Sequence, residues 1–236
     1  MRALSRPMMT RLARVAGGSA WRHAARWALC VALAGCSNPY KPTLHLEETR
    51  QSIPATVFQE PMRDLSPPDD REASSSHSVA VTSHNRVDGP LPRLIEQAIR
   101  ADFSATSLFR YFSSERERAD LVMSGTIYRF YGEVTMPSWQ VIPGLNLFLQ
   151  AVTGSGEEWS GEVDLELRLS RPDGRQLGAY RGRVRFHEAA SATASAWSAP
   201  LYPAHARLNR AFTEALQQIR DQMFGDRELL LAAIKQ

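Results

Sequence analysis

Two neighbouring segments in which charged and apolar side chains alternate constrain the fold more than any other feature of this sequence. Charged and apolar residues alternate from Glu162 to Leu169, and arginines alternate with small or apolar residues from Gly178 to His187. A period of two indicates half-buried strands, and Asp173-Gly174 between the segments is typical of a tight hairpin turn. The sequence therefore predicts a β-hairpin.

If Asp173 and Gly174 form a two-residue turn, a single register matches opposite charges on one face and apolar side chains on the other. The expected facing pairs are Glu162–Arg185, Asp164–Arg183, Glu166–Arg181, Leu167–Tyr180 and Val163–Val184. Agreement of charge and apolarity in one register is evidence for that register. The three arginines are candidates for an anion site, but their acidic neighbours favour a solvated face of paired charges.

The beginning of the chain is basic and then apolar, which is the pattern of a secretory signal segment. Residues 1–35 contain six arginines and no acidic residue, and they end in a short apolar run, Trp27–Gly35. That run is too short to span a bilayer. Without residues 1–35, Lys+Arg falls from 28 to 22 against 25 Asp+Glu, so the remaining chain has a formal charge of −3. The basic character belongs to the leading segment and does not indicate nucleic-acid binding.

The sequence Leu33-Ala34-Gly35-Cys36 resembles the lipobox of bacterial lipoproteins. In that family a diacylglycerol is attached to the cysteine thiol, and a dedicated peptidase cuts before the cysteine. The resemblance implies that residues 1–35 are a signal peptide and that Leu33, Ala34, Gly35 and Cys36 form its recognition site. It also implies that Cys36 carries the lipid, which anchors a protein stably when two or three acyl chains are present. The alternatives are an ordinary signal peptide that happens to end at a cysteine, and a buried amino-terminal helix.

The residue after the lipobox cysteine bears on the location of the protein. In enterobacterial lipoproteins Asp at this position favours retention in the inner membrane, and other residues favour the outer membrane. Ser37 occupies the position here. The resemblance therefore implies an outer-membrane lipoprotein that faces the periplasm.

No motif for catalysis or for metal binding stands out in the remaining chain. Cys30 would leave with the signal segment, so the mature domain has no disulfide and no thiolate metal site. Its histidines have neither HxH nor HExxH spacing; they are His45, His77, His84, His187 and His205. Its serines show no G-x-S-x-G pattern. We therefore expect a protein that is not an enzyme, with no metal and no cofactor except the covalent lipid on Cys36.

Residues 36–77 are predicted to form a lipidated amino terminus and a flexible tether. They contain six prolines and polar clusters such as Ser74-Ser75-Ser76, a composition that favours extended and weakly ordered chain. A short strand at 55–59 is an alternative within this segment. The folded domain is expected to span residues 78–236 and to begin with a short strand at 78–82.

The folded domain is predicted to contain two amphipathic helices and a few strands. Asp88 is the expected cap of the first helix, and the long strand is expected at 120–134. The first helix has an apolar stripe made by Leu91, Leu94, Ile95, Ala98 and Ile99. The stripe of the second helix, which ends at Gly225, is made by Leu208, Phe212, Leu216, Ile219 and Met223. A short extra helix is expected at 226–234.

This order of elements predicts an α+β fold. We expect a mostly antiparallel sheet of about four strands with the two amphipathic helices packed on one face. A helix that ends in Ser107-Leu108-Phe109 and is followed by Ala119-Asp120-Leu121-Val122-Met123-Ser124-Gly125-Thr126-Ile127 resembles small envelope lipoproteins related to the curli-secretion lipoprotein and to the amino-terminal domain of TolB. The resemblance covers about 40 residues and implies a fold and a setting in envelope assembly, but no catalytic residue.

An apolar insertion at 136–152 separates the long strand from the hairpin. It has no charged residue, and prolines and a glycine within it argue against one continuous helix. In the curli-secretion lipoprotein, insertions between strands cross the membrane in an oligomeric pore. By that analogy, the candidates for contact with the membrane or a partner are Trp139, Leu145, Leu147, Phe148 and Leu149. The alternative is a short helix packed against the sheet through Leu145, Phe148 and Leu149.

The sequence as a whole predicts a lipid-anchored, non-enzymatic accessory or assembly protein of the bacterial cell envelope that binds protein partners. Homo-oligomers are compatible with this prediction, and the partners cannot be named from the sequence. The first alternative is an oligomeric export or pore component that uses the insertion at 136–152. The second alternative is an envelope hydrolase whose catalytic residues form no recognisable motif.

Overall fold

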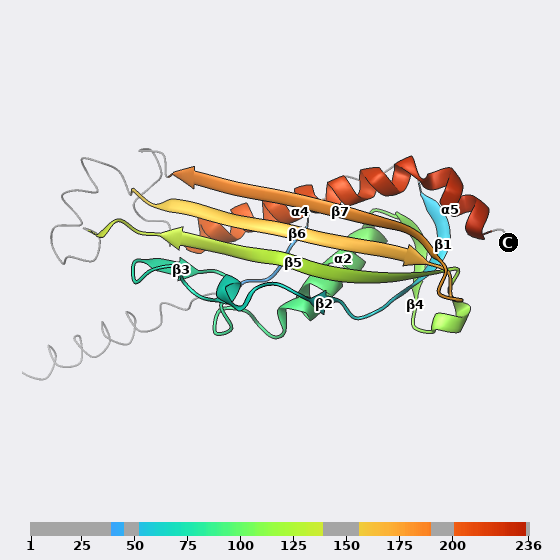
Figure 1. The fold of residues 1–236 in the computed structure, drawn as a ribbon, viewed down its shortest axis with the longest axis horizontal. Helices are drawn as coiled ribbons and strands as arrows, with labels where there is room; N and C mark the ends of the chain where they lie inside the picture. Colours follow the sequence, from blue (N-terminus) through green and yellow to red (C-terminus); the bar gives the residue numbers. More distant parts are fainter. Residues whose placement is uncertain (1–38, 45–51, 139–155, 190–200, 235–236) are drawn as a thin grey trace, which may run out of the picture. The chain divides into compact units, whose positions relative to one another are not determined.

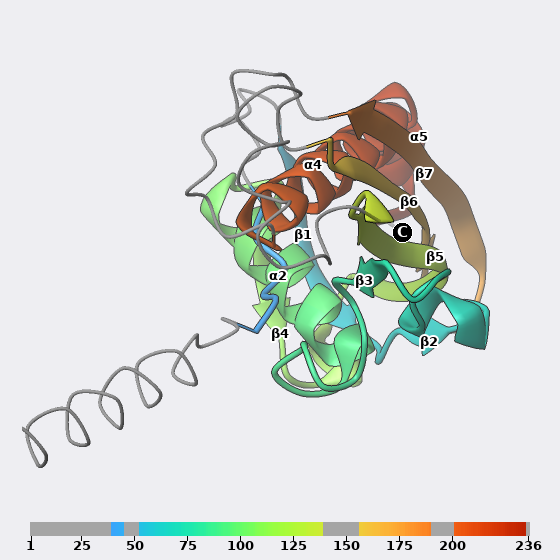
Figure 2. The ribbon, with the colours of Figure 1, turned by 90° about the vertical axis from the view of Figure 1, so that its left-hand side faces the viewer.

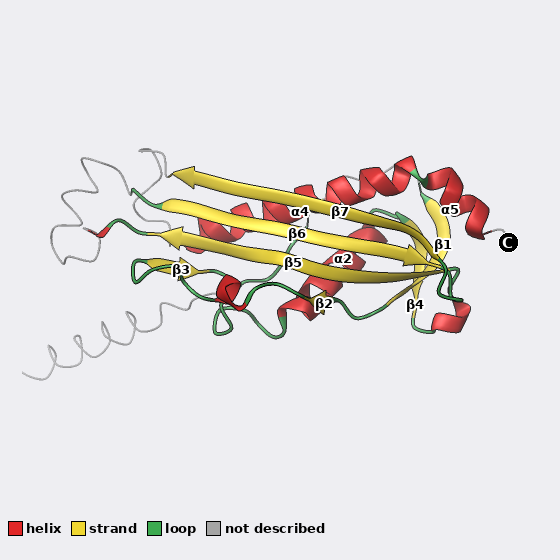
Figure 3. Ribbon diagram, viewed as in Figure 1, coloured by secondary structure: helices red, strands yellow, loops and turns green. Residues whose placement is uncertain are grey.

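The computed structural model describes residues 39–44, 52–138, 156–189 and 201–234. These residues belong to one compact unit, Pro39–Gln236. Within them the chain forms a mixed sheet of seven strands and three α-helices (Figures 1 and 3). The α+β class predicted from the sequence is therefore confirmed. The signal peptide and lipobox at 1–36 and the part of the insertion from 139 onward lie outside the described residues.

Three long strands dominate the sheet. The main path has the order β4-β1-β5-β6-β7, in which the strands are β1 (Ile53–Gln59), β4 (Phe109–Ser113), β5 (Leu121–Thr135), β6 (Glu158–Ser170) and β7 (Gln176–Ala189). Two short strands, β2 (Arg63–Asp64) and β3 (Ser78–Ala80), pair with β5. The pairings of β1 with β4 and β5, and of β2 with β5, are parallel, and the other pairings are antiparallel.

The prediction of about four mostly antiparallel strands is therefore wrong in number and partly wrong in direction. The long strand expected at 120–134 is confirmed as β5. Two of the missed strands, β2 and β4, have only two and five residues, which is too few to show a clear period in the sequence.

The segment predicted to be a tether contributes a central strand to the sheet. β1 lies between β4 and β5, and its residues Ile53, Ala55 and Val57 are fully buried. Pro54 interrupts the apolar run at a place where the pairing with β4 is irregular, which is where a strand tolerates proline. The proline-rich composition of the segment therefore led to the prediction of a tether, although the segment contains a strand. The alternative of a short strand at 55–59 lies within β1.

The folded unit also begins much earlier than expected. It starts at Pro39, and the side chain of Tyr40 is fully buried. The predicted domain start at Ser78 is therefore wrong. A buried tyrosine close to the lipobox is a single residue, and no period or spacing in the sequence distinguishes it from a tyrosine in a linker.

The hairpin has the register predicted from the sequence. All five expected facing pairs are observed between β6 and β7. The turn differs from the prediction, because the Gly174 N–H donates to the carbonyl of Arg171 at 2.9 Å and Gly174 has a φ of 92°. These features describe a longer turn that closes with a glycine in the left-handed region. An irregular pairing next to Leu169 then restores the expected register.

The helices are α2 (Leu91–Ala105), α4 (Leu201–Gly225) and α5 (Arg227–Ile234). The predicted buried stripe of α4 is confirmed, since all five of its residues are fully buried. Asp88 does not cap α2; Pro90 occupies the cap position without a side-chain hydrogen bond. Leu108 and Phe109 belong to the next segment rather than to the helix, because Ser107 adopts a φ of 55° and the Leu108 N–H donates to the carbonyl of Phe103 at 3.1 Å. This geometry terminates helices.

The helices α2 and α4 lie on the same side of the curved sheet (Figure 2). α4 packs across β5, β6 and β7, while α2 packs on β4 and α5 contacts β1 and β7. Gly182 of β7 permits a close approach of α4, because a Cβ atom at this position would lie 1.9 Å from the carbonyl oxygen of Ala215. The absence of a side chain at Gly182 thus sets the distance between the helix and the edge of the sheet.

Candidate functional site

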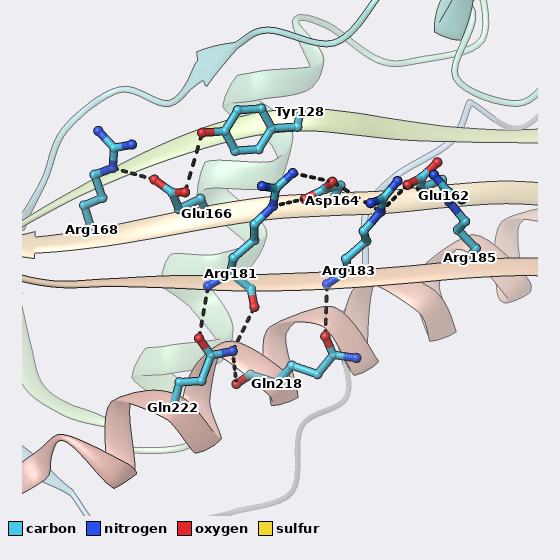
Figure 4. A network of polar contacts seen from close by, with 10 residues as sticks. All are labelled: Tyr128, Glu162, Asp164, Glu166, Arg168, Arg181, Arg183, Arg185, Gln218 and Gln222. Carbon is cyan, nitrogen blue, oxygen red and sulfur yellow. Dashed lines mark hydrogen bonds and ion pairs between the residues drawn. The ribbon is translucent and has the colours of Figure 1, made fainter.

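The side of the sheet opposite α2 and α4 carries a network of charged side chains on three strands. We call it the charged face (Figure 4). β5 contributes Tyr128, β6 contributes Glu162, Asp164, Glu166 and Arg168, and β7 contributes Arg181, Arg183 and Arg185. The alternation of β6 and β7 explains this grouping, since their apolar residues point to the opposite face and pack against α4.

Two buried carboxylates form the centre of the charged face. The Asp164 carboxylate accepts hydrogen bonds from Nε and one terminal nitrogen of Arg181, both at 2.7 Å. The Glu162 carboxylate accepts a hydrogen bond from Nε of Arg183 at 2.6 Å and lies 2.9 Å from Nε of Arg185. Arg183 also lies 3.4 Å from the Asp164 carboxylate. Three guanidinium groups thus share two carboxylates.

The ion pairs are partly diagonal, although the backbone register is the predicted one. Arg181 faces Glu166 in the register but binds Asp164 instead. Glu166 pairs with its neighbour Arg168. The twist of the strands and the length of the arginine side chain bring diagonal neighbours within reach. The predicted pairs Glu162–Arg185 and Asp164–Arg183 are therefore confirmed as ion pairs. The third predicted pair, Glu166–Arg181, differs, because each of its members binds another partner.

The prediction of a solvated face is correct only for the arginines. The side chains of Glu162 and Asp164 are each 3% exposed, whereas Arg181, Arg183 and Arg185 are 51%, 49% and 65% exposed. The guanidinium groups cover the carboxylates because their stems extend over the neighbouring strand. A molecule that approaches this face therefore meets guanidinium groups first, although the buried carboxylates beneath them neutralise much of their positive charge.

Aromatic side chains and a short helix extend the network to β5. The guanidinium carbon of Arg181 lies 4.4 Å from the ring centre of Tyr128, and that of Arg129 lies 4.9 Å from the ring centre of Tyr131; both are cation–π contacts. Arg129 also pairs at 2.8 Å with Asp70, which belongs to the 3-10 helix η1 (Pro68–Arg71). These contacts fix the orientation of the guanidinium groups before any partner binds.

The arginines lower the pKa of one of the central carboxylates, that of Glu162. Burial alone would raise the pKa of Glu162, but hydrogen bonds from Arg185 and Arg183 outweigh burial and hold its pKa below the ordinary value. The hydrogen bond to Asp164 raises the pKa of Arg181. Both effects keep Glu162 and Arg181 charged at neutral pH.

The open edge of β7, next to the charged face, is occupied by side chains of α4. The Arg181 N–H donates to Oε1 of Gln222 at 3.2 Å, and the Gln222 amide donates to the Arg181 carbonyl at 2.8 Å. The Arg183 N–H donates to Oε1 of Gln218 at 2.9 Å. Two glutamines thus bind the edge as a neighbouring strand would, which protects the edge from pairing with another chain.

Other features of the described residues give weaker candidates for a functional site. A hollow of about 400 Å³ is lined by residues that include Asp64, Arg71 and His84, and there Asp64 is already paired with Arg71 at 3.0 Å. Within the described ranges, no cluster of three or more His, Cys, Asp or Glu side chains is arranged to hold a metal. None of the helices in this part of the chain has the length and apolarity needed to cross a bilayer.

The residues singled out from the sequence are not brought together in the described part of the chain. The lipobox residues Leu33, Ala34, Gly35 and Cys36 lie outside it. So do the insertion residues Trp139, Leu145, Leu147, Phe148 and Leu149, and their roles stay predictions. Asp120 of the envelope-lipoprotein resemblance has a structural role, because its carboxylate accepts a hydrogen bond from the Thr56 N–H at 2.7 Å and thereby joins β1 to the start of β5.

Sequence reasoning missed the burial of Glu162 and Asp164 and the roles of Gln218 and Gln222. Alternation in β6 correctly assigns the carboxylates to the polar face, but it does not show that side chains of the next strand cover them. The glutamines lie on the polar side of an amphipathic helix, where glutamine is common, and only the position of α4 beside β7 gives them a function.

No protein-family model matches the chain, and no curated protein matches it. Several solved structures resemble it weakly. A Xanthomonas campestris protein of the DUF330 family has a TM-score of 0.46 and 14% identity, over 80% of this chain and 99% of that chain. A Helicobacter pylori homolog of the neuraminyllactose-binding hemagglutinin has a TM-score of 0.43 and 8% identity, over 84% and 97%. Uncharacterized lipoprotein B from Nitrosomonas europaea has a TM-score of 0.38 and 13% identity, over 77% and 94%. These values do not assign the chain to a family.

Replacing Gln218 and Gln222 together with alanine should expose the edge of β7. We expect the double variant to self-associate in detergent at concentrations where the parent is monodisperse, because backbone groups of Arg181 and Arg183 then lack partners. Sedimentation velocity measures the change. Gln217→Ala is the matched control, since Gln217 bonds Asp221 on the helix surface. A double variant that sediments like this control would show that the glutamines do not protect the edge.

Because the pKa of Glu162 is lowered in the folded state, the free energy of unfolding should decrease at acidic pH. The contribution is complete above the ordinary glutamate pKa of about 4.3 and is lost as the pH falls through the lower pKa of the folded state. Glu162→Gln should reduce the free energy of unfolding at neutral pH by about 1–3 kcal/mol and flatten its dependence on pH below that value.

Urea unfolding between neutral and acidic pH measures both effects. Glu228→Gln serves as the control, because Glu228 is 87% exposed and pairs with its neighbour Arg227 on the surface. If the two variants show the same stability at every pH, the pairing at Glu162 does not contribute to the fold.

Proposed function

We propose that this chain is a lipid-anchored, non-enzymatic accessory or assembly protein of the bacterial cell envelope that binds a protein partner through its charged face. The lipid is attached to Cys36, and the body faces the periplasm from the outer membrane. Both halves of the proposal, the anchor and the binding face, make separate predictions.

The observation that carries the proposal is that the folded unit begins only a few residues after the lipobox in the sequence. The unit begins at Pro39, and only Ser37 and Asn38 separate it from Leu33-Ala34-Gly35-Cys36. A basic and apolar leader, a small-residue cleavage site and a folded body in immediate succession suit a protein that is exported, cleaved and held by acyl chains. An amino-terminal helix packed into the body is less compatible with this order.

The charged face supports binding of a protein with an acidic surface. Its three arginine side chains are about half exposed or more, while the carboxylate side chains that they bind are covered. Arginine presents several donors in a planar group and retains free donors when it is already paired through Nε. An acidic side chain of a partner can therefore be bound without breaking the existing ion pairs. The face is also preorganised by stacking on Tyr128, which lowers the entropic cost of binding.

The anchor is tested by the mass of the mature protein. Purified from native membranes, the protein should begin at Cys36 and carry the mass of a diacylglycerol, with or without an additional acyl chain on the amino group. Cys36→Ala should abolish the modification and release the protein from the membrane fraction. Mass spectrometry of an uncleaved, unacylated chain in the membrane fraction would refute this half of the proposal.

The binding face is tested by photo-crosslinking in cells. A photoreactive residue at Arg168 or His187, which flank the central ion pairs, should give discrete protein adducts, whereas one at Leu229 on α5 should not. Arg185→Gln should reduce the yield severalfold, because it removes an exposed charge while Arg183 still binds Glu162. Arg118→Gln, at an arginine that is 77% exposed elsewhere, is the control. Equal yields in the two variants would refute the role of the charged face.

A further inference from the structure

The first residues of the folded unit are fixed firmly in the body. The Tyr40 N–H donates to the carbonyl of Arg86 at 2.7 Å, and its hydroxyl donates to Oδ1 of Asn209 at 2.8 Å. Its ring lies 6.2 Å from the ring of Phe130 and 5.3 Å from that of His205. Contacts with the 83–88 turn, with β5 and with α4 thus hold one residue on the helix side of the sheet.

Only a short piece of chain separates this fixed point from the proposed lipid. Tyr40 follows Cys36 by four residues, and four residues span at most about 14 Å when fully extended. That distance is close to the diameter of one helix with its side chains, roughly 10–12 Å. A body connected in this way cannot turn freely, because the point at Tyr40 must stay next to the lipid headgroups.

The surface around Tyr40 is formed by two segments that are distant in sequence. Residues 39–44 run beside the 83–88 turn, where Tyr40 forms a bridge with Val87. Lys41 and Asn85 are exposed on these segments, and Lys41 lies 3.7 Å from Asp88. This surface is polar and contains a lysine that can approach lipid phosphates.

We propose that the lipid anchor seats the body on the bilayer through residues 39–44 and the 83–88 turn, with the charged face directed away from the membrane. The inference rests on the proposed lipid anchor at Cys36. Tyr40 contacts Phe130, which packs on Phe212 of α4, so the anchored side is the helix side of the sheet. Arg181, Arg183 and Arg185 lie on the opposite side and remain accessible to a protein partner.

The orientation is measured with single fluorescent labels on the lipidated protein. Cys36 is acylated in that protein and Cys30 leaves with the leader, so an introduced cysteine is the single free thiol. We compare Asn85→Cys in the turn with His187→Cys beside the charged face, both in vesicles of phosphatidylethanolamine and phosphatidylglycerol that contain spin-labelled headgroups. The label at 85 should be quenched severalfold more than the label at 187. A long Gly/Ser linker inserted before Pro39 should remove the difference.

The outcomes separate this inference from the proposed function. Equal quenching at both positions, or stronger quenching at 187, in protein whose mass shows the diacylglycerol would overturn the orientation and leave the anchor intact. A mass without the lipid, together with failure to float with the vesicles, would overturn the anchor and the orientation with it. Persistence of the difference after linker insertion would show that the short connection does not cause it.

Discussion

The sharing of two buried carboxylates among three arginines is the interaction on which the rest of this structure depends. Glu162 and Asp164 lie on β6, the middle one of the three long strands, and their side chains are almost completely buried. An unpaired carboxylate in such a place would cost several kcal/mol, so β7 must pair with β6 in the register that supplies the guanidinium groups. The apolar pairs on the opposite face have the same register, so both faces of the hairpin favour it.

A chain of contacts links this register to Tyr40, near the start of the folded unit. The register of β7 places Gly182 where the backbone of α4 can approach it, and it places the open edge next to Gln218 and Gln222. Those contacts fix the helix that carries Asn209, and Asn209 binds Tyr40. The charged face and the start of the chain are therefore linked through one helix and held on opposite sides of the sheet.

Local patterns in the sequence predicted the hairpin and the buried stripe of α4, because each depends on residues that are near one another in the chain. The central strand β1 was not predicted as part of the domain, since its partners β4 and β5 follow more than 50 residues later and prolines surround it. The coverage of Glu162 by Arg183 depends on the reach of side chains across strands, and the role of Gln222 depends on tertiary packing. The lipobox residues are also consecutive in the chain, so an anchor at Cys36 could be predicted without knowledge of the fold.

Neutron reflectometry of the lipidated protein on a supported bilayer tests the proposed direct connection between a lipid on Cys36 and the body. Because Tyr40 is only four residues from Cys36, protein density should begin within about 14 Å of the headgroups. A flexible tether from Cys36 to Ser78 would instead have an end-to-end distance of roughly 35 Å. We expect a protein layer in contact with the headgroups. A solvent layer of the tether's thickness between headgroups and protein would contradict the direct connection.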